Sequence, residues 1–235
     1  MSRQFDNFDE FADDYQEKLD AAVRFSGAES GYFHQQKVSE VCAFESAQFG
    51  GRFLDFGCGD GLSLDLFSRA FPRAQFSGTD VSKRSLQVAA RRVPQADLRA
   101  YDGGRLPFDD QSFEVVYTSM VLHHIEPRLH AHTLLELRRV LAPGGRLYVF
   151  EHNPWNLLTR KVVADCEFDR DAILLSMPRL GRALRLAGFQ ALQGRFILFV
   201  PPTPRLSWLR FLDRWLFWCP LGAQYYFRCV SRGQV

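Results

Sequence analysis

Two patterns alternate along the middle of the chain: short apolar runs and longer stretches of mixed polarity. The apolar runs at 53–56 and 113–117 have the length and content of buried parallel strands, and FSGTD at 76–80 is predicted to be a further strand that ends in an acid. The stretches that follow them, such as 62–71 and the amphipathic stretch before 143–145, are typical of helices. Strands and helices in alternation predict a doubly wound α/β fold with a mostly parallel sheet.

The pattern continues toward the C-terminus. We expect a Pro-Gly-Gly stop at 143–145, a fifth strand that ends at Glu151 and His152, and helices at 156–164 and 177–187. Two final strands are predicted at 192–200 and 225–230. The N-terminal region, 5–50, is helical in pattern, with a break at Ser26 and Gly27 and a second helix at 32–48.

An insertion at 203–224 separates the two final strands. Its aromatic and leucine residues recur every three or four positions, which predicts a helix with an aromatic face: Trp208, Phe211, Leu212, Trp215 and Trp218. Packing on the domain or on a second subunit is the favoured interpretation of this face. The wall of an apolar substrate pocket and peripheral membrane contact are the alternatives.

Three glycines follow the first strand at intervals of two residues: Gly57, Gly59 and Gly61. Glycine permits positive φ and lets a ligand approach the backbone, and the helix that follows would point its first N–H groups over the turn. A dinucleotide dehydrogenase has G-x-G-x-x-G here, whereas this chain has G-x-G-x-G. Asp80 ends the second strand about 20 residues later, where a ribose diol would be held; N-capping the next helix is its alternative role.

The stretch RFLDFGCGDGLSL at 52–64 resembles motif I of the class I S-adenosylmethionine (SAM) dependent methyltransferases. The segments FSGTD, AYDGGRLPF and ELRRVLAPGGRLYVFEH continue the resemblance in order through His152, and LPF and HHI resemble the quinone-biosynthesis branch. The resemblance implies SAM as cofactor, with S-adenosylhomocysteine as product, and Asp102 and Gly103 at the adenine. The expected cofactor-binding residues are Asp55, Gly57, Cys58, Gly59, Gly61, Asp80, Val81, Asp102, Gly103 and Ser119.

The same resemblance implies a single-domain, Rossmann-like, seven-stranded sheet whose final strand pair is antiparallel. Residues 1–50 would form a helical lid over the cofactor, and 51–235 the core that binds it. The expected substrate-binding residues are Tyr15, Tyr32, Phe33, His34, Asn153 and Trp155. For each of the four lid residues, simple packing of the helices onto the sheet is an alternative at least as strong.

Composition narrows the function class. The 235 residues carry a formal net charge of +2 with acids and bases interspersed, which does not favour a nucleic-acid partner. We expect no signal peptide and no membrane-spanning run, and therefore a cytoplasmic protein. Five cysteines without CxxC spacing predict reduced thiols, and we expect no metal, because His130 and His132 would point to different faces of a helix.

Candidate catalytic residues lie at strand ends. His152 and Glu151 follow the fifth strand at the active-site rim, and a histidine there could accept a proton at neutral pH. The alternative is that His152 and Asn153 only orient the loop. Glu151 could instead bind a cationic amine acceptor. His124, with His123 beside it, is a weaker candidate, because a structural role suits both.

The sequence therefore predicts methyl transfer to a hydroxyl, amine or carbon of a small, partly apolar molecule by in-line displacement. A non-methylating SAM enzyme, such as a decarboxylase or cyclase, and a catalytically silent partner subunit are the alternatives. We also expect a homodimer through the aromatic face of 208–218. The acceptor itself is not determined by these motifs.

Overall fold

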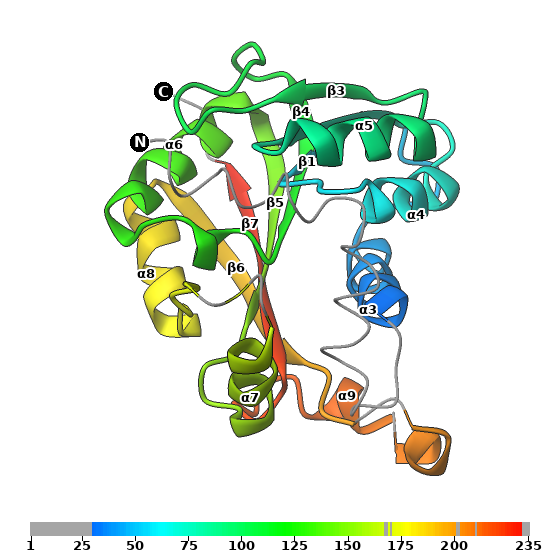
Figure 1. The fold of residues 1–235 in the computed structure, drawn as a ribbon, viewed down its shortest axis with the longest axis vertical. Coiled ribbons are helices and arrows are strands. Elements are labelled where there is room, and N and C mark those ends of the chain that lie inside the picture. The colour runs from blue at the N-terminus through cyan, green and yellow to red at the C-terminus, as the bar shows by residue number, and fades with distance from the viewer. Residues whose placement is uncertain (1–29, 167–168, 170, 201–202, 210, 232–235) are drawn as a thin grey trace.

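The computed structural model describes residues 30–166, 169, 171–200, 203–209 and 211–231. They form a mixed α/β fold around one sheet with the strand order β3-β2-β1-β4-β5-β7-β6 (Figure 1). The strands are β1 (Arg52–Phe56), β2 (Gln75–Asp80), β3 (Asp97–Ala100), β4 (Phe113–Ser119), β5 (Leu141–His152), β6 (Phe189–Ile197) and β7 (Gln224–Ser231). The predicted fold class is confirmed.

The first five strands pair in parallel, whereas β7 runs antiparallel between β5 and β6. The order reverses at β1, which has β2 on one side and β4 on the other. In open α/β sheets, ligands bind at the carboxyl ends of the strands beside such a switch point. The predicted final pair is present, although β6 starts at Phe189 and ends at Ile197, earlier than expected at both ends.

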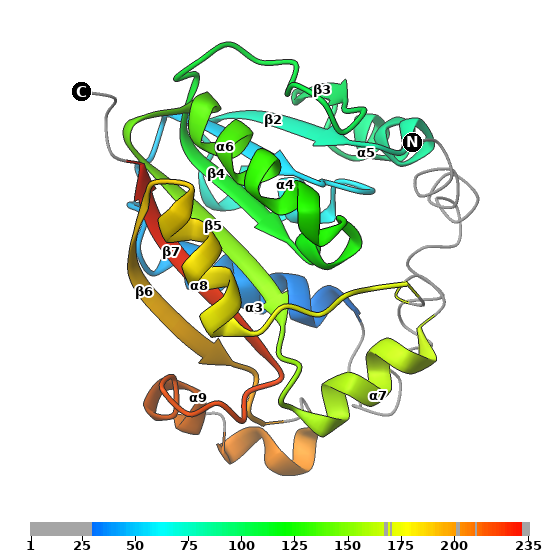
Figure 2. The same cartoon turned by 90° about the vertical axis from the view of Figure 1, so that its left-hand side faces the viewer.

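Helices cover both faces of the sheet, as Figures 1 and 2 show. One face carries α3 (Ser30–Cys42), α4 (Leu62–Ala70) and α5 (Lys83–Arg92), and the other carries α6 (His130–Val140) and α8 (Met177–Leu186). Short 3-10 turns at Leu122–His124 and Pro127–Leu129 connect β4 to α6. Near the carboxyl end of β5, α7 (Leu157–Asp165) is capped by the Asn156 side chain, which accepts from the Thr159 N–H.

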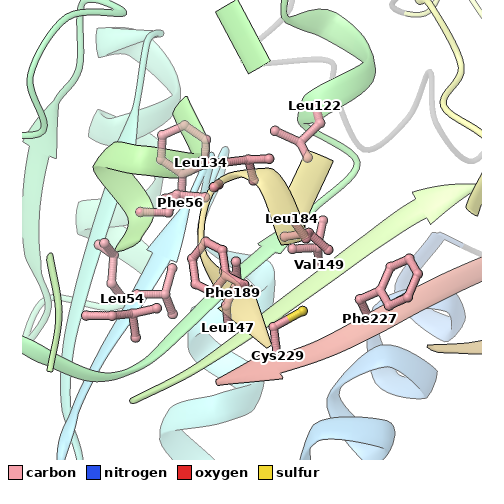
Figure 3. Packing of buried hydrophobic residues seen from close by; sticks show 14 of the residues in the cluster. Leu54, Phe56, Leu122, Leu134, Leu147, Val149, Leu184, Phe189, Phe227 and Cys229 are labelled. Atoms are coloured by element: carbon pink, nitrogen blue, oxygen red, sulfur yellow. The ribbon is translucent and has the colours of Figure 1, made fainter. Parts of the chain in front are cut away.

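The alternation of side chains along β1 builds two cores. Phe53 packs toward α4, where its ring centroid lies 4.6 Å from that of Phe67, in a cluster that also holds Tyr117. Leu54 points to the opposite face and joins the cluster drawn in Figure 3, which α6 and α8 complete with residues such as Leu134 and Leu184. β1 is thus buried on both faces, as is typical of a central strand in a parallel sheet.

Two expected boundaries are wrong. The helix predicted at 32–48 ends at Cys42. The Pro-Gly-Gly stop does not precede the strand but lies inside β5, where the register shifts between Phe113↔Leu141 and Val115↔Arg146. Gly144 adopts φ +76 there, a conformation that suits a bulge.

The insertion also differs from its prediction. A 3-10 segment (Pro204–Leu209) and the short α9 (Phe211–Trp215) replace the single helix. After α9, the Phe217 carbonyl accepts a hydrogen bond from the Phe196 N–H of β6, which holds the chain beside that strand. Trp208, Trp215 and Trp218 are 70%, 73% and 68% exposed, so packing of these side chains on their own domain is wrong.

Candidate active site

The glycine turn joins β1 to α4, and its three glycines all have positive φ. Gly57, Gly59 and Gly61 have φ of 76°, 52° and 79°. A Cβ on Gly57 would lie 2.3 Å from Val121 Cγ2, and one on Gly61 would lie 3.0 Å from Ala89 Cβ. A Cβ on Gly59 would meet no atom of the described residues within 4 Å. Packing therefore requires two of these glycines, whereas Gly59 leaves bare backbone facing open space, as a ligand cradle would.

Asp80 fixes this turn from the end of β2. Its Oδ2 accepts from the Gly59 N–H at 2.8 Å and its Oδ1 accepts from the Ser82 N–H at 2.9 Å. Ser82, and not Asp80, is the N-cap of α5, because its side chain accepts from the Ser85 N–H. The alternative N-cap role of Asp80 is therefore wrong, and Asp80 lines the pocket described next.

A pocket of about 1040 Å³, part of it open to solvent, lies over the carboxyl ends of β1, β2 and β4. Six of the expected cofactor-binding residues line it: Gly57, Gly59, Asp80, Val81, Gly103 and Ser119. Asp60, Thr79 and Tyr101 also line it, and the sequence analysis missed them, although Asp60 lies within the glycine motif itself. Asp55, Cys58, Gly61 and Asp102 are not among the lining residues.

Asp55 and Cys58 lie beneath the turn. Burial, and then the charge of Asp80, raises the pKa of the Asp55 carboxyl well above its usual value. Burial likewise raises the pKa of the Cys58 thiol, which opposes the thiolate a nucleophile requires. Asp102 is exposed and accepts from the Gly104 N–H at 2.9 Å, which shapes the loop that presents Gly103 to the pocket.

A buried lysine that the sequence analysis did not identify reaches this region from α3. Lys37 Nζ donates to Ser119 Oγ at 2.7 Å, and Ser119 lines the pocket. Burial lowers the pKa of Lys37 to about 8, while the charges of Glu151 and Asp55 oppose that shift. A lone lysine in a helical stretch carries no sequence signal that would distinguish it from a surface residue.

The predicted lid residues fall into two groups. Tyr15 lies outside the described residues. Tyr32, Phe33 and His34 lie on α3, and none of them lines the pocket. His34 Nδ1 is 2.8 Å from Ser63 Oγ on α4, so for His34 the packing alternative is favoured.

The other two expected substrate-binding residues follow β5. Asn153 is buried and its amide donates to the carbonyls of Pro220 and Gly222, while its Oδ1 accepts from the Trp155 N–H. These bonds support the interpretation that Asn153 orients the loop. Trp155 is half-exposed, with its ring centroid 6.3 Å from that of Phe196.

A cluster of histidines and carboxylates adjoins the pocket. His123 is fully buried, and its Nδ1 donates to Glu151 Oε2 at 2.6 Å. Glu151 Oε1 accepts from the Leu122 N–H at 2.9 Å, so both oxygens of this carboxylate already accept hydrogen bonds. Asp169 Oδ1 lies 3.4 Å from His123 Nε2 and 3.3 Å from His124 Nε2.

The charges in this cluster are coupled. Burial opposes a charge on His123, but the carboxylates of Glu151 and Asp169 outweigh it and raise its pKa to about 9. Burial likewise opposes the charge on Glu151, but His123 outweighs it and lowers the Glu151 pKa. His124 has a lowered pKa because of burial and the neighbouring His123. It also lines the pocket, so the cluster reaches the pocket wall through this residue.

His152 lies at the edge of the same cluster, its ring centroid 5.3 Å from that of His123. Burial, and then the charge of His123, lowers its pKa to about 4, so the ring is neutral at neutral pH. Its buried Nδ1 has no hydrogen-bond partner among the described residues. His130 and His132 do lie on different faces of α6: the first is buried against the Leu122 carbonyl and the second is exposed.

The pocket thus has two chemically different parts. One part is polar and consists of backbone and the Asp80 carboxylate, which suits a nucleoside. The other part is apolar, with Val121, Ile125 and Leu129 beside His124. No helix among the described residues is long and apolar enough to cross a bilayer.

Comparisons with known proteins agree on one family. Residues 54–149 match the model of the family described as methyltransferase domain. The ubiquinone/menaquinone biosynthesis C-methyltransferase of Desulfotalea psychrophila is 35% identical over 106 residues, which are 44% of this chain and 42% of that protein. The trans-aconitate 2-methyltransferase of Variovorax paradoxus is 33% identical over 118 residues, 48% of this chain and 45% of that protein. The chain thus spans less than half the length of these relatives.

A solved structure extends the likeness to the whole fold. The SAM-dependent methyltransferase from Thermotoga maritima superposes with a TM-score of 0.71 over 98% of this chain and 100% of that one. Their sequences are 19% identical, so this comparison concerns the fold alone. The likeness includes the sheet with its antiparallel last strands, beyond the matched residues 54–149.

Proposed function

Because residues 54–149 match the methyltransferase-domain family, we propose that the chain is a class I SAM-dependent methyltransferase that transfers a methyl group from SAM to a small, partly apolar molecule. SAM supplies an activated methyl on a positively charged sulfur. The protein therefore has to bind the cofactor, hold an acceptor in line with the methyl carbon and keep water away.

The observation that carries this proposal is the position of Gly59. Its backbone adopts φ +52 in a turn that lines the pocket, and a side chain there would meet none of the described atoms within 4 Å. The Asp80 carboxylate lies beside it and is hydrogen-bonded to its N–H. Bare backbone next to a carboxylate fits a ribose with two hydroxyls, which agrees with the cofactor of the family.

The acceptor class follows from the other part of the pocket. Val121, Ile125 and Leu129 would hold an apolar body, and His124 would meet a polar group on it. We infer that this group is a hydroxyl. In the reaction the acceptor oxygen bonds to the methyl carbon, the carbon–sulfur bond breaks with its electron pair going to sulfur, and the hydroxyl proton leaves.

His152 is proposed to take that proton. Its Nδ1 is buried without a described partner, and its lowered pKa keeps the ring unprotonated at neutral pH. General bases contribute about 100-fold to 10,000-fold in rate, and a weak base belongs at the low end of this range. A His152→Ala variant that binds SAM normally should therefore lose about 100-fold in kcat with a hydroxyl acceptor. An unimpaired variant removes His152 from this role.

An amine acceptor held by Glu151 is the alternative. In that case Glu151→Gln should raise KM for an amine much more than for a neutral acceptor. The hydrogen bonds from His123 and from the Leu122 N–H already occupy both Glu151 oxygens, which favours a positioning role for this residue. We therefore expect equal effects of Glu151→Gln on the two acceptor classes.

The first experiment is isothermal titration of the purified protein with SAM and with S-adenosylhomocysteine, with Asp80→Ala as control. We expect micromolar binding of both ligands and weaker binding by the variant, whose fold is checked by circular dichroism. Phenolic, enolic and amine acceptors are then screened with SAM by mass spectrometry. A product that gains one methyl group supports the proposal, whereas a SAM-dependent product without it supports a decarboxylase or cyclase. A protein that binds neither ligand is a silent partner subunit, and the proposal fails.

A further inference from the structure

Three side chains beside the pocket present possible metal-donor atoms to one another. His123 and His124 belong to the 3-10 turn after β4, and Asp169 follows α7. One ring nitrogen of each histidine and one carboxylate oxygen of Asp169 all lie within 4.8 Å of one another. Two imidazoles and one carboxylate are a donor set that divalent transition metals favour.

The two nitrogen–oxygen separations exceed those of charged hydrogen bonds and match the distance between two ligands of one metal ion. Charged N–H···O hydrogen bonds are short, about 2.7–2.9 Å. The two Nε2 to Oδ1 separations are 3.4 and 3.3 Å. Ligands at about 2.0–2.1 Å from a tetrahedral Zn²⁺ lie roughly 3.4 Å apart, so an ion between these atoms would need little movement of either pair.

The orientation of His123 gives a second, independent argument. Its Nδ1 donates to the ionised Glu151, which leaves Nε2 facing Asp169. This Nε2 is buried, and the carboxylate of Asp169 faces it at 3.4 Å, longer than a charged hydrogen bond. A carboxylate that orients the opposite ring nitrogen is the usual arrangement behind a histidine bound to a metal.

Accessibility supports the same assignment. The His123 side chain is fully buried, whereas those of His124 and Asp169 are 21% and 11% exposed. His124 also lines the pocket where the acceptor is expected. Three protein ligands with access to a pocket are typical of catalytic metal sites, in which the remaining position is taken by water or substrate.

We propose that His123, His124 and Asp169 bind one divalent transition-metal ion of the Zn²⁺ class, with Glu151 orienting His123 from behind. The site is separate from the residues that would hold SAM. If the proposed function is correct, the open position of the ion takes the acceptor oxygen, which restricts the substrate to molecules with a metal-binding hydroxyl, enol or phenol.

The test is metal binding by the purified full chain after treatment with a chelator. Zn²⁺ and Co²⁺ are titrated separately by calorimetry, and the visible absorption of bound Co²⁺ reports its coordination. We expect one ion per chain and Co²⁺ bands typical of tetrahedral or five-coordinate nitrogen and oxygen ligation. Asp169→Asn and His124→Gln should each weaken binding more than 100-fold, and Glu151→Gln about 10- to 100-fold.

Two matched controls address surface binding. Asp97→Asn and His132→Gln change the same residue types at exposed positions, where Asp97 contacts Arg99 and His132 lies near the Gly104 carbonyl. Both should bind the ion as the wild type does. No stoichiometric binding, or binding that the Asp169 and His124 substitutions leave unchanged, overturns the proposal.

A parallel SAM titration of the metal-free protein separates the two proposals. Normal SAM binding without any metal binding refutes the metal site alone. Metal binding without SAM binding refutes the proposed function and leaves the metal site intact.

Discussion

The replacement of Gly59 by alanine tests the cofactor cradle most directly. The backbone at Gly59 has φ +52, where an L-residue other than glycine is strained. The added methyl would meet none of the described atoms within 4 Å, so it adds no clash to the protein itself. Whatever it obstructs must therefore be a ligand that contacts this backbone.

The magnitude follows from these two facts. Left-handed backbone costs an L-residue about 1–2 kcal/mol, and this is the expected loss in the free energy of unfolding of Gly59→Ala. A methyl in the path of a bound nucleoside should in addition weaken SAM by more than about 10-fold, or ~1.4 kcal/mol. The backbone strain lowers the free energy of unfolding with or without SAM, whereas the obstruction by the methyl group affects only the binding of SAM.

Gly144→Ala is a matched control. Gly144 has φ +76, its Cβ would also meet nothing within 4 Å among the described residues, and it lies in the bulge of β5, outside the pocket lining. Urea denaturation should show similar losses of stability for both variants. Calorimetric titration with SAM should show weaker binding for Gly59→Ala alone. Equal SAM affinity of the two variants would refute the placement of the cofactor over Gly59.

Three further predictions concern the core, a buried charge and the exposed tryptophans. Phe67 is fully buried against Phe53, so Phe67→Ala should lower the free energy of unfolding by about 3–5 kcal/mol. A loss below about 1 kcal/mol would contradict the packing described. Lys37 has its pKa lowered by burial from 10.5 to about 8, so the folded state bears a charge penalty below pH 8 that disappears as the pH rises to 10.5. Lys37→Met should therefore raise the free energy of unfolding most at pH 7, by on the order of 1–3 kcal/mol, as measured by urea denaturation. If the gain in stability over the wild type does not shrink at higher pH, the buried charge of Lys37 is not its cause. If the exposed aromatic face forms a homodimer, sedimentation should show a dimer that Trp215→Ser converts to a monomer, and a wild-type monomer at working concentration would count against it.

The core of the fold was predictable because its signals are local. The apolar runs at 53–56 and 113–117 lie within β1 and β4, and the strand predicted at 76–80 lies within β2. β1 and β4 are buried along most of their length, so their residues are largely apolar. The glycine motif was equally accessible, because positive φ at three positions of one turn leaves a pattern in the sequence.

Parts of the site could not be predicted in this way. The motif marks Gly57, Gly59 and Gly61 alike, yet Val121 and Ala89, from distant segments, make two of them necessary for packing and leave Gly59 to the pocket. Exposure of the insertion was also unpredictable, since its aromatic spacing suits a core helix. The hydrogen bond that holds the chain after α9 comes from β6, which lies outside the insertion.

The sequence by itself determined the order of the parallel strands along the chain, the glycine turn, and the acid at the end of β2, because strand burial and turn geometry act on neighbouring residues. Only the tertiary structure brought His123 against Glu151, 28 residues away along the chain, and placed Asp169 beside them. The physical reason is that a buried charge is stabilised by whichever partners the fold brings near it. These partners follow the ends of β4, β5 and α7, and residues that meet only in space leave no periodic signal in the sequence.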